Sequence, residues 1–106
     1  MLLGKSHSKN NVLIRLPEER WQHITTSHLE INPSDSQKIL DIVNDPDFIL
    51  KGDFEELLAV KKDSTNEIWI VVVYKEVSPE DGFVITAYLT TDSRWLFRRD
   101  VLWTKN

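Results

Sequence analysis

Two hydroxyl side chains, Thr86 and Tyr88, lie two residues apart in segment 83–91, whose alternating pattern predicts a β-strand. Alternate side chains of a strand share one face of its sheet, so both hydroxyls are expected on the same side. The apolar residues of the opposite side are expected to face a helical core: Phe83, Ile85, Ala87 and Leu89. A pair of hydroxyls can orient a phosphate or a base. Threonine and tyrosine are also good strand formers on a half-exposed face, so the pattern equally fits a structural strand.

His28 is the second group suited to proton transfer. Trp21, Ile24 and His28 recur at helical spacing, which predicts one helix face that carries all three. Histidine titrates near neutral pH and therefore suits general acid–base catalysis. Packing on the indole, with a hydrogen bond to backbone, explains the same position in structural terms. His23 lies well off this face, and no role is assigned to His7.

The sequence offers cations near its end but no sign of a metal or phosphate loop. Three arginines lie near the C-terminus: Arg94, Arg98 and Arg99. They form either a solvated surface rim or a cluster able to bind an anion. The chain has no Cys and only three Gly, and His23 and His28 are poorly spaced to share a metal ion. We therefore expect neither a metal ion nor any other cofactor.

Composition indicates an ordinary globular protein with an acidic balance. The 106 residues carry a formal net charge of −4 and fit one domain. The acidic charge argues against strong non-specific binding to nucleic acid, which normally needs a basic surface. The longest apolar run, 68–74, is too short to span a bilayer, and the absence of Cys fits a reducing cytoplasm. We expect a mobile leader over 1–10 and a single domain over 11–106.

Periodicity predicts an α+β fold in which two N-terminal helices pack on a four-stranded antiparallel β-meander. The helices are expected over 17–29 and 33–44, the second capped by Asn32. Segment 11–16 is either a short strand or the approach to the first helix, and 93–106 is ambiguous between helix and strand. The four strands are expected over 47–51, 57–62, 67–77 and 83–91, with 67–77 at the centre of the sheet. A polar connection, 63–66, joins the second predicted strand to the third.

Four short fragments, in this order and at these spacings, resemble a known signature. They are Arg20-Trp21-Gln22-His23-Ile24, His28-Leu29-Glu30, Asn44-Asp45-Pro46-Asp47-Phe48-Ile49 and Val84-Ile85-Thr86-Ala87-Tyr88. Together they are similar to the RxWxHI…RHPE…NPDxI…TAY pattern of small phage and bacterial domains grouped with the barnase–EndoU–colicin–RelE nuclease superfamily. The resemblance covers roughly 15–91. Ser27 and Leu29 depart from it, because the family motif has Arg and Pro at these positions.

The resemblance implies a metal-independent endoribonuclease, as the toxin of a toxin–antitoxin pair or a phage-derived effector. RNA would be its substrate and an antitoxin protein its partner. His28, His23, Thr86 and Tyr88 take the catalytic positions of the motifs, and Arg20 takes a phosphate-binding position. Arg94 and Arg98 are the further candidates for contact with substrate. A non-catalytic protein-binding module, which would use the acidic second helix and the aromatic C-terminus, is the alternative.

Overall fold

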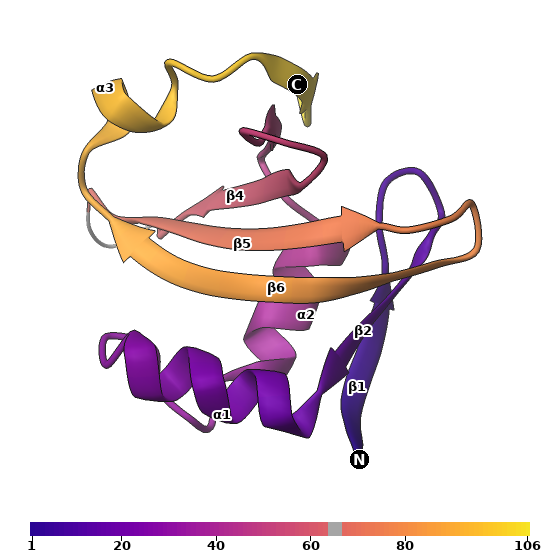
Figure 1. Cartoon of the computed structure of the whole chain (residues 1–106). Coiled ribbons are helices and arrows are strands. Elements are labelled where there is room, and N and C mark those ends of the chain that lie inside the picture. Colours follow the sequence, from indigo (N-terminus) through magenta and orange to yellow (C-terminus); the bar gives the residue numbers. More distant parts are fainter. Residues whose placement is uncertain (64–66) are drawn as a thin grey trace.

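One mixed seven-stranded sheet organises the described residues, 1–63 and 67–106, of the computed structural model (Figure 1). Its strand order is β1-β2-β6-β5-β4-β3-β7. The elements in chain order are β1 (Leu2–His7), β2 (Leu13–Pro17), α1 (Glu18–Ser27), α2 (Ser36–Asn44), β3 (Phe48–Lys51), β4 (Leu57–Lys62), β5 (Trp69–Glu76), β6 (Asp81–Thr90), α3 (Ser93–Leu96) and β7 (Val101–Thr104). Within these ranges, no helix is long and apolar enough to cross a membrane. Residues 64–66 of the predicted polar connection lie outside the described residues.

The prediction of two helices on a four-stranded antiparallel meander is wrong. The sheet has seven strands, and β2 pairs in parallel with β6 through Leu13 and Asp81 at one end and Arg15 and Phe83 at the other. Segment 2–7, expected in a mobile leader, forms β1 and pairs antiparallel with β2. The physical reason lies in β2, whose alternate side chains are apolar and buried, so that it needs neighbours on the sheet.

Helix α1 matches its predicted face, and α2 is shorter than predicted. Trp21 and Ile24 are buried, as their spacing indicates. Helix α2 begins at Ser36 and not at residue 33, so the prediction that Asn32 caps it is wrong. The Asn32 side-chain oxygen instead accepts a hydrogen bond from the Ser34 backbone N–H at 2.9 Å, which closes a turn before the helix.

Strand β5 separates two hydrophobic cores. It pairs antiparallel with β4 and with β6, which confirms its predicted central place. Val72 and Tyr74 belong to the core beneath α1 and α2, whereas Val71 and Val73 belong to a second core on the other face. Figure 1 shows α1 and α2 on one side of the sheet and α3 on the other. We call these two faces the helix face and the C-terminal face.

A β-bulge in β6 changes which side chains point to which face. Val73 pairs with Thr86, but Tyr74 pairs with Val84, so Ile85 is the extra residue. Ala87 and Leu89 pack on the helix face, as predicted. Ile85 was predicted on that face too, and this is wrong, because the bulge places it with Tyr88 on the C-terminal face.

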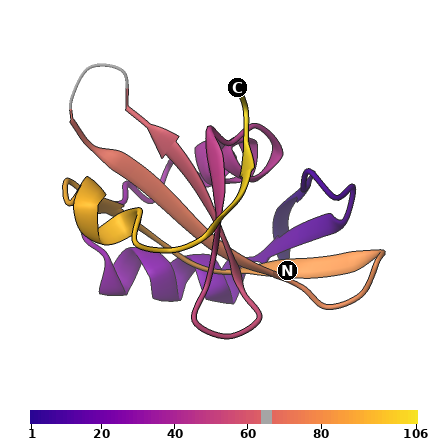
Figure 2. The same ribbon diagram turned by 90° about the horizontal axis from the view of Figure 1, so that it is seen from above.

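The ambiguous C-terminal segment contains both a helix and a strand. Asp92 caps α3 by accepting a hydrogen bond from the Trp95 backbone N–H at 3.0 Å. Leu96 is fully buried, and the ring of Phe97 lies 5.1 Å from that of Trp69. The chain then crosses the C-terminal face to β7, which pairs with β3 at the end of the sheet (Figure 2). This segment therefore covers the second core.

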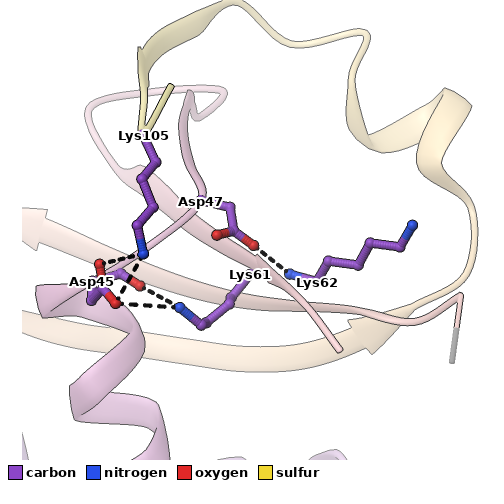
Figure 3. A network of polar contacts seen from close by, with 5 residues as sticks. All are labelled: Asp45, Asp47, Lys61, Lys62 and Lys105. Carbon is purple, nitrogen blue, oxygen red and sulfur yellow. Dashed lines mark hydrogen bonds and ion pairs between the residues drawn. The ribbon is translucent and has the colours of Figure 1, made fainter. Parts of the chain in front are cut away.

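Ion pairs fasten the end of β7 to α2 and β4 (Figure 3). The Asp45 carboxylate follows α2 and lies 3.1 Å from the Lys105 ammonium and 3.5 Å from that of Lys61. Asp47 adds two bonds: its carboxylate accepts from the Lys62 backbone N–H and its carbonyl accepts from the Lys105 N–H, both at 3.0 Å. Lys105 and Lys61 lower the pKa of Asp45 below its ordinary value.

The lowered pKa makes the attachment of β7 sensitive to acid. Because the pKa of Asp45 is depressed in the folded state, its ion pairs stabilise the fold above the ordinary pKa, and this contribution is lost as the pH falls through the lowered one. We expect Asp45→Asn to reduce the loss of stability in acid, measured by urea unfolding between about pH 5 and pH 2. Asp41→Asn is the control, because Asp41 bonds the neutral side chain of Gln37. Equal acid sensitivity in wild type and Asp45→Asn would contradict the prediction.

Tyr74 provides a test of the helix-face core. Its side chain is fully buried, burial raises its pKa well above the ordinary value, and its hydroxyl has no hydrogen-bond partner among the described residues. Since an unpaired buried hydroxyl is costly, Tyr74→Phe is expected to raise the free energy of unfolding by about 1–2 kcal/mol. Denaturant unfolding measures this change. Tyr88→Phe, which removes the hydroxyl of a partly exposed tyrosine, should leave stability nearly unchanged.

Candidate functional site

Tyr88 lies on β6 at the C-terminal face of the sheet. It pairs with Val71 across β5 and β6 and packs at the margin of the second core while staying partly exposed. Thr86 stands on the same face two residues earlier, opposite Val73. The two hydroxyl side chains thus share one face, as their spacing predicted.

One edge of β6 is open beside Tyr88. Strand β2 pairs only with residues 81–83, so the rest of β6 has no strand on that side within the described ranges. The turn that ends α1 lies along this edge, and Figure 1 shows α1 running beside β6. The Glu30 carboxylate accepts a hydrogen bond from the Leu89 backbone N–H at 3.4 Å. This bond holds the turn against the strand.

His28 reaches Tyr88 around the open edge. As the C-cap residue of α1, His28 donates its backbone N–H to the Ile24 carbonyl at 2.8 Å. The two ring centroids lie 6.1 Å apart with 34° between the planes. The His28 Nδ1 atom also lies 3.5 Å from the Glu30 carboxylate. The structure therefore brings a carboxylate, an imidazole and a phenol into one region.

Charges near Tyr88 act on its phenol in opposite directions. Burial raises the pKa of Tyr88 above the ordinary value of 10.0, the positive charge of Arg99 lowers it and the negative charge of Asp53 raises it. Arg99 and Asp53 form an ion pair, with Nη1 and Oδ1 2.9 Å apart. The phenol therefore keeps its proton at neutral pH, and an arginine acts on it from nearby.

A cavity of about 400 Å³ continues from Arg99. Its walls come from the β3–β4 turn and from the segment between α3 and β7: Lys51, Gly52, Asp53, Trp95, Arg98, Arg99 and Asp100. We call it the Trp95 cavity. The Arg99 guanidinium carbon lies 5.7 Å from the centroid of the Trp95 ring, and Nη1 of Arg99 also reaches the Lys51 carbonyl at 3.4 Å. Arg98, a predicted substrate contact, lines this cavity.

The remaining predicted residues lie elsewhere. Arg20 and His23 are exposed on α1 and line a separate hollow together with Pro17 and Glu19. Arg94 is exposed on α3 and is not among the residues that line the Trp95 cavity. The structure thus brings His28 and Tyr88 together. Arg98 lies with Arg99 in the lining of the Trp95 cavity, whereas Arg20 and His23 line a different hollow on α1.

Sequence reasoning missed three contributors to this region. Glu30 was part of a matched fragment but received no role, although its spacing of two from His28 was a signal. Arg99 belongs to the predicted C-terminal cations but not to the predicted substrate contacts, and Trp95 received no predicted role. Two of them have partners far away in the sequence: Arg99 bonds Asp53 across 46 positions, and Glu30 accepts from Leu89 across 59.

Comparison with known proteins adds no relative: no protein-family model, curated protein or solved structure matches the chain. In the part of the chain that the structure describes, no three His, Cys, Asp or Glu residues are grouped so as to hold a metal ion.

The pKa of Tyr88 tests the electrostatics of this region. The chain has two tyrosines, so Tyr74→Phe leaves Tyr88 as the single phenol to follow by NMR titration. In that background Arg99→Ala should raise the pKa of Tyr88, because a nearby positive charge is removed. Asp53→Asn should lower it, because Arg99 then acts without a neighbouring carboxylate. Shifts of the opposite sign, or none, would contradict the described contacts.

Proposed function

We propose that the chain is a metal-independent endoribonuclease whose candidate catalytic residues are His28 and Tyr88. One observation carries the proposal: an imidazole lies 6.1 Å from a phenol and 3.5 Å from a carboxylate, at an accessible edge of the sheet. Proton-transfer groups on two sides of one reacting phosphate are what cleavage of RNA without a metal needs. Their fragments also resemble the His-containing and TAY motifs of the barnase–EndoU–colicin–RelE nucleases.

The proposed reaction is a transesterification within the RNA. The 2′-oxygen attacks the adjacent phosphorus and loses its proton to a general base, while the 5′-oxygen of the next nucleotide leaves and receives a proton from a general acid. The products are a 2′,3′-cyclic phosphate and a free 5′-hydroxyl. No oxidant or further reactant is needed.

His28 is assigned the role of base and Tyr88 that of acid. The raised pKa of Tyr88 means that the phenol carries a transferable proton at neutral pH. Glu30 is assigned to position the imidazole, because its carboxylate lies 3.5 Å from His28 Nδ1. Arg99 lies close enough to Tyr88 to act on its charge and is suited to stabilise the anionic phosphorane. Thr86, on the same face, is assigned to orient the substrate.

The cellular role proposed is that of a toxin in a toxin–antitoxin pair or of a phage-derived effector in the cytoplasm. The family resemblance supports this role. Ser27 and Leu29 replace the Arg and Pro of the motif beside His28, and Leu29 is 85% exposed. Arg20 and His23, which share the hollow on α1, are assigned to contacts with flanking RNA phosphates.

A non-catalytic protein-binding module is the second candidate, and the C-terminal segment favours it. Trp95, Val101 and Leu102 are 45%, 49% and 54% exposed, and β7 lies at the end of the sheet. An exposed apolar edge strand is a common docking element, because a partner strand can complete its hydrogen bonds. In this second candidate function, the protein partner would bind the exposed residues of the C-terminal segment, and the chain would cleave no RNA.

Cleavage of RNA by the purified protein tests the proposal. Total RNA should be cut equally with and without a chelator, and the products should carry cyclic phosphate ends. His28→Ala and Tyr88→Phe are each expected to slow cleavage by about 10²-fold or more. His7→Ala is the control, since it removes an exposed imidazole from β1. If the wild type cuts no RNA, or if both variants cut at its rate, the nuclease proposal fails and the binding module is favoured.

A further inference from the structure

The Trp95 cavity has the size of a small-ligand site and a mostly charged lining. Its volume of about 400 Å³ lies within the range of about 300–1,000 Å³ that small-ligand sites occupy. Three cationic side chains, Lys51, Arg98 and Arg99, line it against the two carboxylates of Asp53 and Asp100. The chain as a whole is acidic, so this is a local concentration of positive charge.

The cations of the cavity differ in their availability. Arg99 is already engaged: it bonds the Asp53 carboxylate at 2.9 Å, and its side chain is only 20% exposed. Lys51 and Arg98 are exposed residues. The cavity is therefore lined by one ion-paired cation, Arg99, and by two exposed cations that are accessible to an anion.

Trp95 supplies an aromatic surface in the same cavity. It is 45% exposed even though the Arg99 guanidinium carbon lies 5.7 Å from its ring centroid. A partly exposed indole offers a face on which a flat ring can stack, and the neighbouring cations can bind an anion attached to that ring. A nucleotide combines a flat base for the indole with a phosphate for the cations. An inorganic anion would leave the indole uncovered.

We infer that the Trp95 cavity binds one nucleotide of a single-stranded RNA substrate, with its base stacked on Trp95 and its phosphate held by Arg98 and Lys51. The inference rests on the proposed ribonuclease function and assigns the cavity as a binding subsite for the same substrate. Arg99 connects the two, since it lines the cavity and acts on Tyr88. Because stacking accepts every base, the subsite gives affinity and register with little sequence preference.

The test uses a fluorescent single-stranded oligodeoxynucleotide, which lacks the 2′-hydroxyl and cannot be cleaved. Its binding to the full chain is measured by anisotropy at several salt concentrations. Trp95→Ala should weaken binding by about tenfold, and Trp95→Phe should retain most of it. Arg98→Gln should weaken binding and reduce its salt dependence, because one phosphate contact is lost. Trp103→Ala is the matched control, since this tryptophan lies on β7 and is not among the residues that line the cavity.

The outcomes separate the subsite from the reaction. If the oligonucleotide binds through Trp95 but no RNA is cleaved, the subsite stands and the nuclease proposal fails. If RNA is cleaved but Trp95→Ala and Arg98→Gln bind like the wild type, the subsite is overturned. Arg98→Gln is an exposed substitution, so it decides the matter even if Trp95→Ala disturbs folding. Where RNA is cleaved, Trp95→Ala should raise KM more than it lowers kcat, as expected for a binding subsite.

Discussion

Strand β5 must be covered on both of its faces, and the rest of the fold depends on this constraint. Val71 and Val72 are adjacent and both fully buried, yet they belong to different cores. Each such burial contributes on the order of 1.5–3 kcal/mol, so a bare face would be expensive. Helices α1 and α2 cover one face, and the C-terminal segment from α3 to β7 covers much of the other. A strand that is apolar on both sides therefore dictates a three-layered arrangement in a chain of only 106 residues.

The second layer also accounts for the candidate site. To bury Leu96, the chain must cross the C-terminal face after β6, and this crossing carries Arg99 and Trp95 toward the β3–β4 turn. The ion pair between Arg99 and Asp53 joins the crossing segment to that turn. The segment that covers the second hydrophobic core thus also places cations on the face on which Tyr88 lies. The segment from α3 to β7 thus contributes both to the second core and to the candidate site. Its short helix and strand depend on these distant contacts, so the local sequence pattern alone does not predict them.

Local pattern predicted the elements well and their neighbours less well. The spacing of Trp21 and Ile24 found the buried face of α1, and the double-sided hydrophobicity of 67–77 placed β5 at the centre. The parallel pair of β2 and β6 joins residues such as Arg15 and Asp81, which are 66 positions apart, and no short connection indicates it. The leader becomes β1 because it pairs antiparallel with β2, whose own place in the sheet depends on that distant pairing. Periodicity reports which face is apolar but not which distant strand completes the sheet.

The contact between His28 and Tyr88 at the candidate site is a further feature that periodicity alone does not predict. The helix face that carries Trp21 packs on one side of the sheet, and Tyr88 lies on the other, so an argument from faces alone would keep the two rings apart. They meet because β2 stops pairing with β6 at Phe83 and leaves an edge around which the end of α1 can reach. The contact between the two rings therefore depends on where the pairing of two distant strands ends, which the pattern of apolar residues along either segment does not indicate.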